Sequence, residues 1–192
     1  MKKGMLFVVS APSGCGKGTI LAEVLRDEKF YYSVSATTRT PREGEEDGVN
    51  YHFIQRQEFE KLISENAFLE YAEYCDNYYG TLKAPIKEHR NQGKHVILEI
   101  EVQGAMQIRK LCPDAKFIFI APPSLEIVRQ RLESRGTEDT ETINKRIQQA
   151  QEELHFLNQY DYCIVNDELS EAIADFKSVV RAEELKIQPE QA

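Results

Sequence analysis

The chain has 192 residues, which fits one compact domain with inserts better than two independent domains. Hydrophobic residues make up 41% and charged residues 29%, so the chain can bury a core, and wholesale disorder is excluded. The formal net charge of −8 argues against a general binder of nucleic acid or anionic membranes. Any polyanion must therefore meet a local cluster of basic residues.

The sequence also indicates where the protein works. No apolar run approaches the roughly 20 residues that span a bilayer, and the apolar stretch after Met1 is too short for a secretory signal. The four cysteines, at positions 15, 75, 112 and 163, show neither a C-x-x-C pair nor a zinc-ligand spacing. We therefore expect a cytoplasmic protein without a disulfide framework or zinc site, acting on small molecules rather than nucleic acids or membranes.

Short apolar runs alternate with helical patterns along most of the chain. Such alternation predicts an α/β fold, with a parallel sheet of five strands flanked by helices. Strands are expected at 5–10, 31–35, 95–100, 116–121 and 162–165. Helices are expected from about Ile20 to Leu25 and at 104–111, 125–133, 142–157 and 169–185.

The stretch 37–83 breaks this alternation. It carries short alternating runs such as 68–74, which predict a small, mostly antiparallel sheet, and a helical pattern near 57–65. We therefore expect a core domain formed by 1–36 and 84–192, with 37–83 as an inserted substrate-binding subdomain. A second polar insert, 134–140, lies within a predicted lid of about 125–155.

A glycine-rich loop follows the first predicted strand and opens the first helix. It reads Ser13-Gly14-Cys15-Gly16-Lys17-Gly18-Thr19. Glycines let backbone N–H groups turn toward phosphate oxygens, the helix start adds donors, and Lys17 adds a positive charge. Compared with G-x-x-x-x-G-K-[ST], Ala11 replaces the first glycine and Gly18 the metal-binding hydroxyl. This variant resembles that of nucleoside monophosphate kinases; the alternative is a strand-to-helix turn without a ligand.

A second motif carries two arginines three residues apart. The string Thr37-Thr38-Arg39-Thr40-Pro41-Arg42 continues through Glu45 and Gly48 to Tyr51 and Phe53. Two guanidinium groups and a phenol can converge on one phosphate. The alternative is an exposed turn with incidental charges.

The string matches T-[ST]-R-x-x-[KR]-x-x-[DE]-x-x-G-x-x-Y-x-F position by position and resembles the guanylate kinase family. Further blocks look like those of the family in the same order, so the resemblance covers nearly the whole chain. They are 77–81, 99–104, 120–124, 135–137, 143–146 and 164–167.

The resemblance implies a P-loop fold and transfer of a phosphoryl group from ATP to GMP, and to dGMP as well, with Mg²⁺ as cofactor. Lys17, Arg39, Arg131, Arg135 and Arg146 would be catalytic. ATP would contact the loop, formed by Ala11, Pro12, Ser13, Gly14, Cys15, Gly16, Lys17, Gly18 and Thr19, and also Asn166. GMP would contact Ser35, Arg39, Arg42, Tyr51, Glu70, Tyr79, Thr81 and Glu101. The metal would be held through phosphates and water, with Glu99 as the candidate protein ligand.

Guanine presents N–H donors beside its O6 acceptor. An ionised Glu70 can accept from the donors and the Thr81 hydroxyl can donate to O6, whereas adenine reverses this pattern. Taken alone, the pattern favours an outward charge on an alternating strand for Glu70, and solvated helix residues for Arg131 and Arg135. Two rival functions also remain: a non-catalytic binding module of the same fold, and a kinase for AMP, UMP or dTMP.

Overall fold

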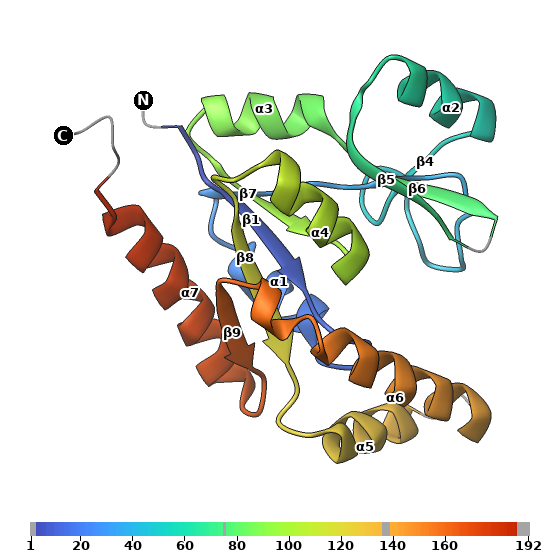
Figure 1. Cartoon of the computed structure of the whole chain (residues 1–192), viewed down its shortest axis with the longest axis vertical. Coiled ribbons are helices and arrows are strands. Elements are labelled where there is room, and N and C mark those ends of the chain that lie inside the picture. Colours follow the sequence, from blue (N-terminus) through green and yellow to red (C-terminus); the bar gives the residue numbers. More distant parts are fainter. Residues whose placement is uncertain (1–2, 75, 136–138, 188–192) are drawn as a thin grey trace. The chain divides into compact units, whose positions relative to one another are not determined.

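The computed structural model describes residues 3–74, 76–135 and 139–187. It has an α/β fold with a five-stranded sheet, in the order β2-β7-β1-β8-β9, and a four-stranded sheet, in the order β4-β3-β6-β5 (Figure 1). The chain divides into two compact units, one formed by residues up to Val9 together with 28–117, the other by 10–27 together with residues from 118 onward. The predicted division into core, insert and lid stays a prediction.

In the first unit, three strands belong to the larger sheet. They are β1 (Leu6–Ser10), β2 (Phe30–Tyr32) and β7 (His95–Glu99). Both β1 and β2 pair with β7 in parallel. Residues Leu6 to Val9 are at most 1% exposed, as expected for a parallel strand covered on both faces. The predicted strands are confirmed, although the one expected at 31–35 begins and ends earlier.

The smaller sheet lies wholly in the first unit. Its strands β3 and β5 both pair with β6 in antiparallel fashion, and β3 pairs with β4 in parallel, which confirms the mostly antiparallel prediction. Phe59, from the helix beside this sheet, stacks on Phe68 at 4.2 Å and on Tyr78 at 5.1 Å between ring centroids. These rings give the small sheet a core of its own. The strands are β3 (Ala36–Thr37), β4 (His52–Phe53), β5 (Phe68–Tyr74) and β6 (Asn77–Leu82).

Three helices complete the first unit: α2 (Arg56–Ser64), α3 (Lys83–Asn91) and α4 (Val102–Leu111). The predictions for α2 and α4 are confirmed within two residues. Helix α3 was not predicted, because Ile86 is its only buried residue and leaves no apolar periodicity. Its Pro85 lies in the first turn, where a missing N–H is tolerated.

The second unit contains the phosphate-loop helix and the C-terminal elements. Strands β8 and β9 pair in parallel, α1 packs against α7, and α5 packs against α6. All the helices and strands predicted here are confirmed: β8, β9 and α7 have the predicted bounds, and the ends of α1, α5 and α6 are shifted. Their bounds are α1 (Lys17–Val24), β8 (Lys116–Ala121), α5 (Leu125–Arg135), α6 (Thr140–Leu154), the 3₁₀ turn η1 (Leu157–Gln159), β9 (Tyr162–Val165) and α7 (Leu169–Leu185).

Helix α6 begins two residues earlier than predicted because Asp139 caps it. The Asp139 carboxylate accepts a hydrogen bond from the Thr142 backbone N–H at 2.8 Å. Ile143 and Ala150 form its buried stripe. Positions 136–138 of the predicted polar insert lie outside the described residues. In the described part of the chain, no helix is both long and apolar enough to cross a bilayer.

Candidate active site

The predicted site residues fall into two groups, one in each compact unit. The phosphate loop belongs to the second unit and depends on two glycines with left-handed backbone. Gly14 has φ +83° and Gly16 has φ +80°, a region where a side chain is strained. A Cβ at Gly16 would also lie 2.4 Å from Nδ2 of Asn166. Glycine is therefore required here by both backbone conformation and space.

The loop ends as the N-terminus of α1. Gly16 caps the helix, and its carbonyl accepts hydrogen bonds from the N–H groups of Thr19 and Ile20. The Cys15 N–H donates to the Pro12 carbonyl, which closes a turn before the helix. The positive end of the helix dipole thus coincides with the loop, and Lys17 is the first helical residue. This arrangement suits an anion such as a phosphate chain.

Cys15 is a packing residue of the loop. Its side chain is fully buried in a cluster with Val128, Leu132 and Ile143. Burial raises the pKa of the Cys15 thiol to about 12, so the reactive thiolate is scarce at neutral pH. The loop therefore offers backbone donors rather than a nucleophile.

Two of the three predicted lid arginines contact the residues around the loop. Arg146 donates from Nη1 to Oγ of Ser13 at 2.9 Å. Arg131 donates from Nη2 to the backbone carbonyl of Asn166 at 3.0 Å. Both contacts lie inside the second unit, so they bring these arginines to the phosphate loop and its neighbour. Arg135 ends α5, and its side chain lies outside the described part of the structure.

Asn166 has a position that sequence reasoning did not anticipate. It is 5% exposed, and its Nδ2 donates to the Cys15 carbonyl at 2.7 Å. One of its amide hydrogens is thus bound to the loop backbone rather than left for a base. A single Asn after an apolar strand carries no signal for such a contact 151 residues away.

In the first unit, Glu70 and Thr81 face each other across β5 and β6. Glu70 is 8% exposed, and Oγ1 of Thr81 donates to its Oε1 at 2.6 Å. Burial raises the pKa of Glu70, and the bonds from Thr81 partly oppose that rise. The alternative of an outward, solvated charge is therefore wrong. A hydroxyl can donate only one hydrogen bond, and that of Thr81 goes to Glu70. To donate to guanine O6, the Thr81 hydroxyl would have to break its bond to Glu70.

The α4 helix approaches Glu70 closely. A Cβ at Gly104 would lie 3.2 Å from Oε2 of Glu70, so the helix backbone forms one wall beside this carboxyl. Such close approach explains a glycine inside a helix, where it otherwise lowers stability.

Arg39, Tyr51 and Tyr79 lie together in the same unit. The guanidinium carbon of Arg39 is 5.6 Å from the Tyr51 ring centroid, and the Tyr51 and Tyr79 rings are 6.0 Å apart. Burial, followed by the nearby Tyr79, raises the pKa of Tyr51, so its hydroxyl stays a hydrogen-bond donor near neutral pH. One cation and two phenols therefore lie close together in this unit.

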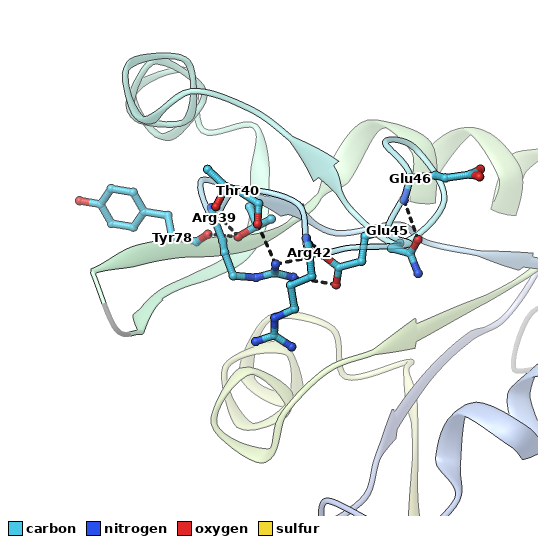
Figure 2. Close-up of polar contacts among 8 residues, drawn as sticks. Arg39, Thr40, Arg42, Glu45, Glu46 and Tyr78 are labelled. Carbon is cyan, nitrogen blue, oxygen red and sulfur yellow. Dashed lines mark hydrogen bonds and ion pairs between the residues drawn. The ribbon is translucent and has the colours of Figure 1, made fainter. Parts of the chain in front are cut away.

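The Arg39 guanidinium is held by an acid whose role the sequence did not reveal. Arg39 forms a bidentate ion pair with Glu45, with both N···O distances at 2.9 Å (Figure 2). Arg42 contributes its backbone N–H to the same carboxylate, and its guanidinium makes no hydrogen bond to any other described residue. Glu45 belongs to the two-arginine motif, but its partner could not be read from the motif.

The remaining predicted residues of this unit lie at strand ends. The Ser35 carbonyl accepts a hydrogen bond from the His52 N–H. Glu99 ends β7 and accepts a hydrogen bond from the Tyr32 hydroxyl at 3.0 Å, a partner that the sequence did not indicate. Burial, then the charge of Glu99, raises the pKa of Tyr32. Glu101 precedes α4 and is exposed.

The chain is similar to known proteins over nearly its whole length. The sequence model of the family described as Guanylate kinase matches residues 3–183. Curated relatives named "Guanylate kinase" include one from Latilactobacillus sakei, 49% identical over 96% of this chain and 92% of its own length. Another, from Carboxydothermus hydrogenoformans, is 52% identical over 97% of this chain and 92% of its own.

A solved structure is also similar. The crystal structure of guanylate kinase from Anaplasma phagocytophilum has a TM-score of 0.79 and 33% sequence identity. The match covers 96% of this chain and 88% of the other. The fold described above is thus one that a guanylate kinase adopts over nearly its whole length.

Proposed function

Because the chain belongs to the guanylate kinase family, we propose that it transfers the γ-phosphoryl group of ATP to GMP, giving ADP and GDP. The observation that carries this proposal is the buried Glu70 carboxyl, bonded to Thr81, in the same unit as Arg39, Tyr51 and Tyr79. A buried acceptor can read the donor edge of guanine, while the cation and phenols bind a phosphate.

The acceptor nucleotide is the substrate of the first unit. Glu70 accepts hydrogen bonds from guanine N1–H and N2–H₂, with Ser35, Thr81 and Glu101 around the base. With AMP, Glu70 would face the N1 lone pair of adenine, and a buried polar group left unpaired disfavours binding. Arg39, Arg42, Tyr51 and Tyr79 hold the GMP phosphate. Because recognition uses the base and phosphate, dGMP also serves as acceptor.

The donor nucleotide is the substrate of the second unit. The backbone N–H groups of residues 11–19 cradle the phosphates of ATP, and Asn166 lies beside the adenosine. Lys17 and the arginines Arg131, Arg135 and Arg146 neutralise the charge that builds up on the transferring group. The contacts of Arg131 and Arg146 around the loop support this role.

The reaction needs no general base from the protein. The attacking group is a GMP phosphate oxygen, which is largely ionised near neutral pH because its second pKa is about 6. That oxygen forms a bond to the γ-phosphorus of ATP while the bond from this phosphorus to the β–γ bridging oxygen breaks, and ADP leaves. The protein therefore contributes alignment, charge neutralisation and exclusion of water.

Mg²⁺ fits this chemistry as an ion carried by the substrate. Among the described residues, no group of three or more His, Cys, Asp or Glu side chains could form a metal cage. Mg²⁺ bound to nucleotide phosphates commonly keeps several waters and takes only one or two carboxylates, so no cage is needed. Glu99 is the proposed carboxylate. The ion would screen the negative charge of the phosphates.

We place the enzyme in the cytoplasm, as the scattered cysteines suggest. With GMP as its acceptor, its proposed role is in purine nucleotide metabolism and GMP recycling. The test is a coupled assay of ADP formation with ATP, Mg²⁺ and each of GMP, dGMP, AMP, UMP and dTMP. We expect the highest kcat/KM with GMP. No turnover at millimolar ATP and GMP would favour the binding module, and a preference for AMP would contradict the guanine assignment.

A further inference from the structure

The carboxylate of Glu45 contacts two arginines of the proposed phosphate site at once. Its Oε1 accepts from Nη2 of Arg39 at 2.9 Å, and its Oε2 accepts from Nη1 at 2.9 Å (Figure 2). The same Oε2 accepts from the backbone N–H of Arg42 at 2.7 Å. One acid therefore fixes the guanidinium of Arg39 and the chain at Arg42, six and three residues away.

These contacts occupy one edge of the Arg39 guanidinium. Nη1 also donates to the Thr40 carbonyl at 2.8 Å, which uses the second of its two hydrogens (Figure 2). The Nε–H and the second hydrogen of Nη2 remain, and in the planar guanidinium they lie on one edge, spaced for two oxygens of a phosphate. The guanidinium also has the Tyr79 hydroxyl as a hydrogen-bond partner, and its central carbon lies 5.6 Å from the Tyr51 ring centroid and 5.8 Å from that of Phe53.

We propose that Glu45 is a positioning residue, which holds Arg39 by its outer edge so that the Nε and Nη2 edge faces the phosphate of GMP. This inference rests on the proposed function. An arginine side chain has several rotatable bonds, and fixing them before the ligand arrives leaves less conformational freedom to lose on binding. Glu45 thus acts through Arg39, without touching the substrate.

The opposite role would be competition, in which the Glu45 carboxylate occupies the place of the phosphate and must leave first. The bond to the Arg42 backbone argues against it, because this bond ties Glu45 to the loop independently of the ion pair. A competitor would have to break all three bonds, whereas a positioning residue keeps them. The two roles predict opposite changes in GMP affinity when the charge of Glu45 is removed.

The test compares Glu45→Gln with Glu46→Gln, which removes the same charge one position along. Glu46 is exposed, its backbone N–H donates to Asn50, and its carboxylate bonds to no other described residue (Figure 2). For Glu45→Gln, we expect Kd and KM for GMP to rise about tenfold or more, since a charge-assisted pair is lost. KM for ATP should stay within about twofold of wild type, and Glu46→Gln should leave all three constants within that range.

Glu45→Gln could also weaken GMP binding by lowering the stability of the loop. To distinguish this effect from one that acts through Arg39, both substitutions are repeated in an Arg39→Met background, and the Kd for GMP is measured by calorimetry. If Glu45 acts through Arg39, Glu45→Gln adds no further loss there. If Glu45 only stabilises the loop through its bond to the Arg42 backbone, Glu45→Gln lowers GMP affinity by the same factor in this background, and the inference is overturned. Tighter GMP binding by Glu45→Gln, or binding equal to wild type, would overturn it as well.

Turnover by the wild-type protein distinguishes failure of this inference from failure of the proposed function. If the wild-type protein phosphorylates GMP and Glu45→Gln does not differ from it, only the role of Glu45 fails. If the wild-type protein neither binds nor phosphorylates GMP, the proposed function fails and the inference falls with it.

Discussion

The two groups of candidate residues are proposed to recognise phosphate in different ways. The loop of the second unit relies on backbone: two glycines with φ near +80° and a helix N-terminus make its anion site. The group in the first unit relies on side chains: Arg39, Tyr51 and Tyr79 are brought together from three strands or loops. Backbone recognition fits any phosphate chain, whereas a set of side chains can also read a base.

This difference has consequences for substitution. In the loop, the proposed phosphate contacts come from the main chain. Substitutions that restrict its conformation should therefore affect the loop more than substitutions that change charge, except at Lys17. In the small sheet, a single buried carboxyl can be exchanged for an amide of the same shape. Its effects on specificity and on stability can then be measured separately.

The largest effect is expected at Lys17, the first residue of α1. Lys17→Met should lower kcat about 10²- to 10³-fold, because it removes a positive charge that is positioned to stabilise the transferring phosphoryl group. Steady-state assays with saturating GMP measure this. The Kd for GMP, measured without ATP, should be unchanged, since GMP is assigned to the other unit.

Lys145→Met is the matched control for Lys17. Lys145 is exposed on α6 and pairs with Glu141 at 2.7 Å, a surface contact of small energy. We expect its kcat to stay within about twofold of wild type. Turnover of Lys17→Met close to that of this control would remove the proposed role of the loop lysine.

The next effect is expected at Glu70. Glu70→Gln places an amide N–H₂ or its single oxygen where two guanine donors need acceptors, so the preference for GMP over AMP should fall by about 1–3 kcal/mol. The ratio of the two kcat/KM values measures it. Glu73→Gln, on the same strand but exposed and paired with Arg56, should leave this ratio unchanged. An unaltered ratio in Glu70→Gln would contradict the role of Glu70.

Glu70 also makes stability depend on pH. Burial raises its pKa, so the folded protein binds this proton more tightly than the unfolded chain. Its contribution to stability is fully present below the unfolded value of about 4.3 and is lost as pH rises through the raised folded pKa. Glu70→Gln, which does not titrate, should therefore gain stability relative to wild type between pH 4 and pH 7. Urea unfolding across this range measures the difference, and a difference independent of pH would contradict the prediction.

The sequence predicted the loop well because its motif lies in seven consecutive residues at the junction of a strand and a helix. It also predicted the sheet, since fully apolar runs such as 116–121 reflect burial on both faces directly. The first unit was harder, because Glu70, Arg39 and Tyr51 lie far apart in the chain. Their roles could be proposed only from a resemblance, and on periodicity alone Glu70 reads as a surface charge.

What the sequence could not provide are contacts that depend on tertiary structure. The bond from Asn166 to the Cys15 carbonyl joins segments 151 residues apart. The Thr81 hydroxyl donates its hydrogen bond to Glu70 because of the register in which β5 and β6 pair. Helix α3 was not predicted because its single buried residue, Ile86, leaves no helical pattern of apolar residues in the sequence. Local propensity does not determine any of these three features.

The smallest effect, and the clearest test of backbone recognition, compares two glycines of the loop region. Gly16→Ala places a side chain at φ +80° and a Cβ 2.4 Å from the Asn166 amide, which must then shift from the Cys15 carbonyl. We expect the free energy of unfolding to fall by about 1–2 kcal/mol from the left-handed backbone alone. Urea unfolding at constant pH measures it.

Gly18→Ala should have the opposite sign. Gly18 lies inside α1, and a Cβ there would meet nothing within 4 Å, so alanine gains helix propensity of up to about 1 kcal/mol. The two variants add the same methyl group two residues apart, so composition and charge cannot explain a difference between them. If both change the free energy of unfolding equally, the loop does not depend on a left-handed Gly16, and its contrast with the side-chain site in the first unit loses its basis.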